Sequence, residues 1–282
     1  MAQKIQLEVS KKEQVTEKVY MVTFRLVSPP IIDFRAGQNM MIMIAPGINR
    51  TMSIASPPSQ STELLMVHDV SPMGPGSKWT VGLNVGDTAT VVAPTGGALS
   101  LVESPRKKVL IATGAGIAPF HAMVLDYFER RAEVGHDTAL RSAFRVLASS
   151  RSSSQSVGSV GNAEAMTTLR SETPPRAGNS LLQSAITLYW GLRYESDVYW
   201  KEEFDRIARE HPTFTWHQVL SKPTDAWQGL RGHVTEHVLS MEKDMPNSDF
   251  YLCGNKAMIE EVRAKLIEQN VPKEQIKTEL FY

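Results

Sequence analysis

Short apolar runs separated by turn-forming residues make up the N-terminal part of the chain. Strands rich in Val, Ile, Thr, Met and Phe are predicted over residues 4–10, 18–27, 38–45, 63–70 and 87–93. Clusters of Pro, Gly, Asn, Asp and Ser separate these strands, and one helical turn is expected over residues 78–83. Short strands at this spacing are typical of a small antiparallel barrel.

A different pattern begins near residue 105, where short apolar runs alternate with segments of helical spacing. Strands are predicted over residues 109–112, 186–191, 214–220, 249–254 and 277–282, and helices over residues 119–131, 201–209, 232–241 and 257–270. This alternation is typical of a doubly wound parallel sheet of the Rossmann type. We therefore expect two domains, an antiparallel β-barrel over residues 1–104 and an α/β domain over residues 105–282.

One stretch, from about residue 147 to residue 184, fits neither pattern. Ser, Arg, Gly, Thr and Pro dominate it, as in Ser149-Ser150-Arg151-Ser152-Ser153-Ser154. Such a composition offers too little apolar surface to order itself. We expect a disordered surface insertion in the second domain. A misread stretch of the gene and a phosphorylated or partner-binding loop are the alternatives.

Bulk properties narrow the classes of function. The chain has 282 residues, with 30 Lys and Arg against 30 Asp and Glu, so no global field attracts nucleic acid or an anionic membrane. No apolar run reaches the roughly 18 residues that span a bilayer, and the N-terminus lacks the apolar core of a signal peptide. One cysteine excludes a disulfide framework and a cysteine-ligated cluster within these residues. We therefore expect a cytoplasmic protein.

A glycine-rich turn follows the first strand of the second domain. Thr113, Gly114 and Gly116 come directly after the apolar run, and Pro119 lies where a helix is expected to start. The two glycines allow a turn with positive φ and a close approach of a ligand to the backbone. Free N–H groups and the dipole of the helix attract an anion at such a place. The segment therefore predicts a phosphate-binding turn, although a purely structural strand–turn–helix has the same pattern.

Five motifs occur in one order along the chain: Arg50-x-x-Ser53-x-x-Ser56, Gly74-x-Gly76-Ser77, Pro94-Thr95-Gly96-Gly97, Gly114-x-Gly116-x-x-Pro119 and Cys253-Gly254-Asn255-x-x-Met258. In their order and spacing they resemble the ferredoxin–NADP reductase family of flavoenzymes. The resemblance covers nearly the whole chain apart from the Ser-rich stretch. It implies an FAD-binding barrel followed by an NAD(P)-binding domain, with FAD and NADP (or NAD) as cofactors.

The resemblance also implies roles for residues of the barrel. Arg50 pairs with the FAD pyrophosphate, a contact that suits guanidinium geometry. Ser53 lies near flavin N5, the atom that accepts hydride, with Thr51 and Met52 in the same segment. Met52 stands where the family usually has a tyrosine against the isoalloxazine, and its polarizable sulfur can still lie against a ring. Backbone N–H groups at a helix start bind the pyrophosphate, from Gly74, Gly76 and Ser77.

Other matching residues lie near the C-terminus. Cys253, followed by Gly254, packs beside the nicotinamide in the family, and Glu279 lies near it. A terminal aromatic ring covers the flavin, and both Phe281 and Tyr282 are candidates by spacing. Without the motif, Cys253 would be interpreted as a small buried apolar residue.

Basic residues follow the strands that would bind the adenosine end of the coenzyme. Arg193 follows one predicted strand, Ser221 and Lys222 follow the next, and Arg231 lies in the loop beyond. A basic residue at this place accommodates the 2′-phosphate of NADP, so we expect a preference for NADPH. The acidic Glu195 and Asp197 stand against this preference. The alternative is that the basic side chains are solvated surface groups.

These inferences predict an FAD-dependent oxidoreductase that transfers hydride between NAD(P)H and flavin and passes electrons to a one-electron carrier such as ferredoxin or flavodoxin. The cofactors supply the reactive atoms, and the protein positions them. One alternative is the reductase component of a multi-subunit oxygenase or hydrogenase, and another is a non-catalytic flavin-binding or partner-binding module. No metal site is expected, because His233 and His237, which are spaced as neighbours on a helix, are interpreted as surface residues.

Overall fold

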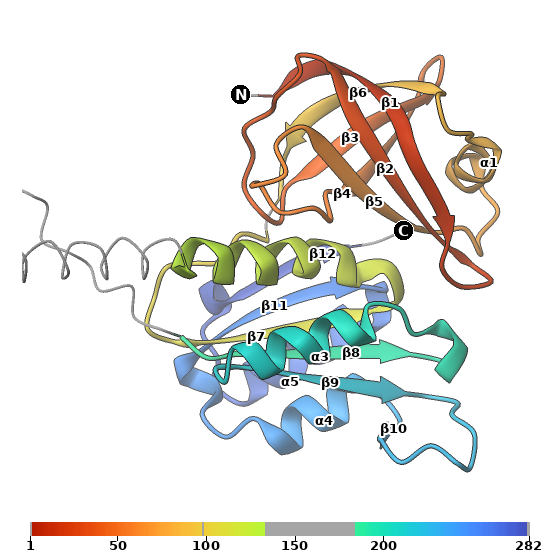
Figure 1. Cartoon of the computed structure of the whole chain (residues 1–282). Coiled ribbons are helices and arrows are strands. Elements are labelled where there is room, and N and C mark those ends of the chain that lie inside the picture. Colours follow the sequence, from red (N-terminus) through yellow and green to blue (C-terminus); the bar gives the residue numbers. More distant parts are fainter. Residues whose placement is uncertain (1, 98, 133–183, 281–282) are drawn as a thin grey trace, which may run out of the picture. The chain divides into compact units, whose positions relative to one another are not determined.

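The computed structural model describes residues 2–97, 99–132 and 184–280 (Figure 1). Described residues up to 127 and from 184 onward belong to one compact unit, which contains two sheets. Nearly all of the expected insertion, and the terminal Phe281 and Tyr282, lie outside the described residues.

The first sheet is antiparallel, with six strands in the order β4-β3-β6-β1-β2-β5. Its elements are β1 (Gln3–Gln14), β2 (Val19–Ser28), β3 (Asn39–Ala45), β4 (Ile48–Ser53), β5 (Glu63–Asp69), α1 (Pro75–Gly82) and β6 (Thr88–Thr95). Alternate residues face its core, so that Ile5 and Leu7 of β1 and Phe24 of β2 are fully buried. This core gives the barrel its own apolar interior.

Two boundaries in the barrel differ from the sequence prediction. Residues 50–56 were expected between strands, but the first four of them lie on β4. Only Met52 and Ser53 of this edge strand are buried, so its apolar pattern is too short to be recognised. Helix α1 begins at Pro75 rather than at residue 78, because proline is favoured in the first turn of a helix.

The second sheet is parallel, with the strand order β10-β9-β8-β7-β11-β12 (Figure 1). Its strands are β7 (Lys107–Thr113), β8 (Ile186–Leu192), β9 (Phe214–Leu220), β10 (Leu230–Arg231), β11 (Ser248–Gly254) and β12 (Ile276–Leu280). The helices of this part of the chain are helix 118–132, α3 (Lys201–Glu210), α4 (Val234–Met241) and α5 (Lys256–Glu268). Short 3-10 helices are η1 (Gly114–Ile117), η2 (Glu195–Asp197), η3 (Met245–Asn247) and η4 (Lys273–Gln275). The predicted fold class, an antiparallel barrel followed by a parallel α/β sheet, is confirmed.

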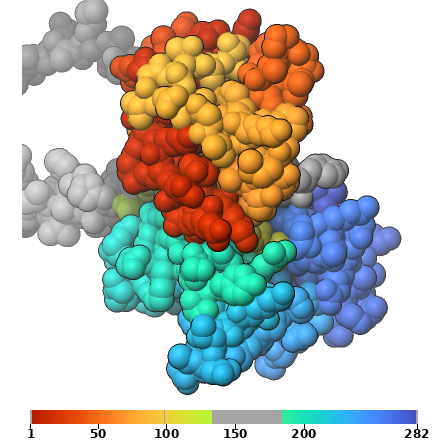
Figure 2. Space-filling model, turned by 90° about the vertical axis from the view of Figure 1, so that its right-hand side faces the viewer, coloured from red at the N-terminus to blue at the C-terminus, as the bar shows by residue number. Residues whose placement is uncertain are grey.

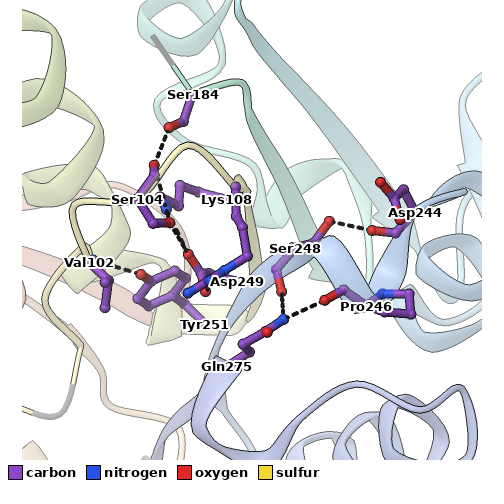
Figure 3. A network of polar contacts seen from close by, with 11 residues as sticks. Val102, Ser104, Lys108, Ser184, Asp244, Pro246, Ser248, Asp249, Tyr251 and Gln275 are labelled. Atoms are coloured by element: carbon purple, nitrogen blue, oxygen red, sulfur yellow. Dashed lines mark hydrogen bonds and ion pairs between the residues drawn. The ribbon is translucent and has the colours of Figure 1, made fainter. Parts of the chain in front are cut away.

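A buried polar network holds the connection between the two sheets (Figure 3). Lys108 Nζ lies 2.7 Å from Asp249 Oδ2, and the two side chains are 1% and 3% exposed. Ser104 Oγ donates to the same oxygen at 2.7 Å, and Arg106 Nε donates to Asp249 Oδ1 at 2.8 Å. A buried charge is tolerated when it is paired and hydrogen-bonded, so this network ties the connecting segment to β7 and β11.

The same region holds both ends of the segment between helix 118–132 and β8. The Tyr127 hydroxyl donates to the carbonyl oxygen of Ser184 at 2.7 Å, and Ser184 Oγ donates to the carbonyl oxygen of Ser104 at 2.7 Å. These bonds therefore join helix 118–132 and the segment before β7 to Ser184, which lies just before β8.

Deletion of residues 150–182 is expected to leave the melting temperature and the fold nearly unchanged. The composition of the segment predicts little buried surface, and loop-closure entropy changes slowly with length. Calorimetry of the two chains provides the measurement, with Tyr127→Phe in the full chain as a control for the anchoring bond. A fall of many degrees on deletion would show that the segment packs on the core.

The variant Asp249→Asn is expected to lower the free energy of unfolding by about 3–5 kcal/mol, because it leaves Lys108 buried without a countercharge. Urea denaturation at neutral pH measures this loss. The double variant Lys108→Met/Asp249→Leu removes both charges and should recover most of the stability. Equal stability of wild type and Asp249→Asn would contradict the assigned role of the pair.

The pH dependence of stability follows from the same carboxyl group. Burial opposes ionisation of Asp249, but the hydrogen bonds from Lys108, Ser104 and Arg106 outweigh burial and lower its pKa. A carboxyl with a depressed pKa stabilises the fold above its unfolded pKa, and this stabilisation is lost as the pH falls through the folded pKa. The stability of the double variant should therefore fall less on acidification than that of the wild type.

Candidate binding and catalytic site

The barrel and the second sheet both contribute to one cavity of about 1220 Å³. It reaches the carboxyl ends of the parallel strands, where ligands bind in doubly wound sheets. The carboxyl ends of β8 and β9 face the viewer in Figure 2. Small-molecule pockets measure about 300–1,000 Å³, so this cavity has room for more than one mononucleotide-sized group.

Most residues predicted from the sequence lie around this cavity. Those that line it are Arg50, Thr51, Met52, Ser53, Gly74, Gly76, Ser77, Thr113, Gly114, Gly116, Arg193, Ser221, Gly254 and Glu279. Those that do not are Pro119, Lys222, Arg231 and Cys253. Residues more than 200 positions apart in the sequence, such as Ser53 and Glu279, are thus brought together.

One end of the cavity carries a cation beside a helix start. A Cβ atom at Gly76 would lie 3.3 Å from Arg50 Cγ and 3.5 Å from His68 Cε1, so the first turn of α1 passes close to both side chains. Gly74 precedes α1, and no side chain caps the free N–H groups there. Arg50 Nη1 donates to the carbonyl oxygen of Asn49 at 2.7 Å. A guanidinium beside a free helix N-terminus is suited to a diphosphate.

The second candidate for anion binding is the turn after β7. Gly114 has a φ of +54°, as the sequence predicted. Gly116 does not, and the expectation of a positive φ there was wrong. A Cβ atom at Gly116 would clash with the carbonyl oxygen of Cys253, so glycine is required by the close packing of β11. Thr113 Oγ1 accepts from the backbone N–H of Asn255 at 3.1 Å, which joins the turn to the start of α5.

Between these two elements lies a hydroxyl–carboxyl pair. Ser53 Oγ donates to Glu279 Oε1 at 2.9 Å. Burial raises the pKa of Glu279, although Ser53 and the side chain of Asn39 favour its ionised form. Asn39 Oδ1 and Glu279 Oε2 are buried and have no hydrogen-bond partner among the described residues. A carboxyl that retains its proton readily, beside a hydroxyl, can hold and move a proton at this point.

Cys253 lies behind this pair rather than in the cavity. It is fully buried, and the register of β11 and β12 places it opposite Glu279. Burial and the nearby Glu279 raise the pKa of the Cys253 thiol well above its ordinary value. A neutral, buried thiol is a poor nucleophile, so Cys253 contributes shape and packing rather than covalent chemistry.

The basic residues at the ends of β8 and β9 do not all converge. Arg193 and Ser221 line the cavity, whereas Lys222 and Arg231 do not. Arg231 Nη2 donates instead to three carbonyl oxygens of its own loop, at 2.8–3.1 Å. Asp197 also lines the cavity. The expected cluster of cations is therefore reduced to Arg193, with an acidic side chain in the same wall.

Several lining residues carried no sequence signal. His68, Asp69, Asn39 and Tyr199 all line the cavity. Burial lowers the pKa of His68 and raises that of Tyr199, whose buried hydroxyl has no hydrogen-bond partner among the described residues. Asn39 could have been found from strand pairing, since it lies opposite Ser53 in the β3–β4 register. The other three come from loops or strand ends, where no periodic pattern identifies them.

Within the described ranges, no group of three or more His, Cys, Asp and Glu side chains could hold a metal ion. None of the helices described has the length and apolarity needed to cross a bilayer.

Residues 164–264 match the family described as the oxidoreductase NAD-binding domain. One component of the Na(+)-translocating NADH-quinone reductase of Pseudomonas paraeruginosa is 28% identical over 236 residues, which are 81% of this chain and 43% of that protein. The anthranilate 1,2-dioxygenase electron transfer component of Acinetobacter baylyi is 25% identical over 252 residues, which are 89% of this chain and 59% of that protein. The chain thus spans about half the length of these curated relatives.

The fold is also similar to that of solved structures. The crystal structure of the Amycolatopsis cytochrome P450 reductase GcoB superimposes with a TM-score of 0.74 at 20% identity, covering 99% of this chain and 70% of that one. At this identity the similarity shows the fold alone, an antiparallel barrel followed by a parallel α/β sheet.

Proposed function

Because residues 164–264 match the oxidoreductase NAD-binding domain family and the fold is similar to that of a solved reductase, we propose that the chain is a ferredoxin–NADP reductase-like protein. It would be an FAD-dependent oxidoreductase that takes hydride from NAD(P)H and passes electrons to a protein carrier. The observation that carries the proposal is the shared cavity. Two anion-binding elements, at α1 and at Gly114, flank the Ser53–Glu279 pair within it. This arrangement would suit two dinucleotides that meet at their reactive ends.

The residues at the barrel end fit FAD. Arg50 and the free start of α1 would hold the pyrophosphate, and Gly76 leaves the space that a Cβ atom would fill. Met52, at 6% exposure, is part of the barrel core and lines the cavity beside Ser53. When bound, FAD would accept hydride and release electrons one at a time.

The chain's own residues would orient the cofactors and handle the proton. The turn at Gly114 and the start of α5 would bind the coenzyme phosphates. Ser53 would share its hydroxyl between Glu279 and the flavin edge, and Glu279 would hold the proton that the transfer releases or consumes. Cys253 would fix the backbone of β11 behind them.

The carrier is proposed as ferredoxin, flavodoxin or an oxygenase component. The sequence given contains one cysteine, so the next redox centre is not a cysteine-ligated cluster within these residues. The relative from Acinetobacter baylyi is named as an electron transfer component of a dioxygenase, which favours the reductase component of an oxygenase as the second candidate. A cytoplasmic location remains part of this proposal.

The purified protein is expected to bind FAD and to reduce ferricyanide with NAD(P)H. The variant Ser53→Val should keep FAD and slow flavin reduction by about two- to twelvefold, since one hydrogen bond contributes about 0.5–1.5 kcal/mol. Stopped-flow absorbance measures the rate. Ser56→Ala is the matched control, because Ser56 Oγ accepts from Leu65 N–H at 3.1 Å, outside the cavity lining. A protein that takes up no FAD on titration would overturn the proposal.

The predicted preference for NADPH now depends on Arg193. The variant Arg193→Ala should lower kcat/KM for NADPH by about ten- to a hundredfold, from loss of a charge-assisted contact of about 1.5–3 kcal/mol, and leave NADH nearly unchanged. Arg231→Ala is the control, since that guanidinium is occupied by its own loop. Equal losses with both coenzymes, or a wild type that prefers NADH, would contradict the assignment.

A further inference from the structure

A buried histidine outside the cavity joins three separate parts of the chain. His121, on helix 118–132, is 5% exposed. Its Nδ1 lies 2.7 Å from the carbonyl oxygen of Ala55 in the barrel, and its Nε2 lies 2.9 Å from Glu203 Oε2 on α3. Its ring stacks on Trp200, with 3.8 Å between the ring centroids and 14° between the planes.

The two partners fix the charge of this ring. A backbone carbonyl can only accept a hydrogen bond, and an ionised carboxylate can only accept. Burial disfavours ionisation of Glu203, but the hydrogen bond and charge of His121, with Arg206, outweigh it and lower the Glu203 pKa. Both ring nitrogens therefore donate, which requires the imidazolium form.

The surroundings suit a cation. The face of Trp200, which stacks on the His121 ring, attracts positive charge. Trp200 has a φ of +59°, an unusual conformation for a bulky residue. Such strain persists where the surroundings over-determine it, and the stacking on His121 is one such constraint. Among the described residues, Glu203 is the charged group that contacts the ring, with Arg206 on the same helix acting on Glu203.

The position of the ring links it to the proposed chemistry. Ala55 follows Ser53 by two residues, and its N–H donates to the carbonyl oxygen of Leu65 at 2.8 Å. Its carbonyl oxygen is held by His121, which lies at the start of the helix that follows the Gly114 turn. One hydrogen bond thus connects the backbone near Ser53 to the helix that follows the Gly114 turn.

We propose that His121 is a positioning residue, held as an imidazolium, which fixes the Ser53 segment of the barrel against the dinucleotide-binding turn. This inference rests on the proposed function. Hydride transfer is sensitive to the distance between donor and acceptor, and a displacement of about 1 Å can cost a hundredfold in rate. Loss of the contact with Ala55 should therefore slow the transfer of hydride to the flavin.

Matched amide variants separate the two contacts. The amide nitrogen of His121→Asn lies near the place of Nδ1 and retains the bond to Ala55, whereas that of His121→Gln lies near the place of Nε2 and retains the bond to Glu203. Stopped-flow flavin reduction by saturating NAD(P)H should be about tenfold or more slower in His121→Gln and in His121→Leu. It should be near the wild-type rate in His121→Asn, which retains the bond to Ala55.

Nitrogen-15 NMR of ring-labelled histidine tests the charge state independently of activity, with the variants providing the assignment. At neutral pH both ring nitrogens of His121 should carry a proton. A neutral ring, or equal rates in His121→Asn and His121→Gln, would overturn the inference. Absence of FAD uptake would instead overturn the proposed function, while the NMR result would still decide the charge of His121.

Discussion

Pairing of buried charge is the constraint on which the second sheet depends. Lys108 and Asp249 face each other across the neighbouring strands β7 and β11, and neither charge is tolerable without the other. The pair fixes the register at one end of the two strands. Their opposite ends carry the Gly114 turn and Gly254, so an interaction remote from the cavity determines where its backbone lies. Ser104 and Arg106 extend the same constraint to the segment that leads from the barrel.

At the cavity the governing quantity is the cost of removing polar groups from water. Burial keeps the carboxyl of Glu279 and the thiol of Cys253 inclined to hold their protons. Glu279 has one hydrogen-bonded oxygen and one buried oxygen without a partner among the described residues, so its hydrogen-bonding capacity is only partly used. Incomplete pairing of this kind is costly to the fold and is retained where chemistry uses it.

Local pattern was enough to predict much of this molecule. Strand periodicity and glycine positions identified the parallel sheet and the turn at Gly114, because these depend on neighbours in sequence. Other features could not be predicted from neighbours in the sequence. Gly116 is required by the close approach of Cys253, and His121 is bonded to Ala55 in the barrel. The guanidinium of Arg231 is bonded to carbonyl oxygens of its own loop, which no sequence pattern reveals. Strand β4 was missed because an exposed edge strand has little apolar signal. Motifs thus located the site, whereas packing decides which side chains reach it.

The bond between Tyr127 and Ser184 has a topological consequence. It joins helix 118–132, which follows β7 in the sequence, to Ser184 just before β8, beside the N-terminal ends of these two paired strands. If the chain were divided between this helix and β8, the first fragment would contain β7. The second fragment would contain β8 and β11, which are the two strands that pair with β7. Association of the two fragments would return β7 to its place between β8 and β11 and with it the turn at Gly114. The segment between the helix and β8 is therefore a suitable place to divide the chain for fragment complementation.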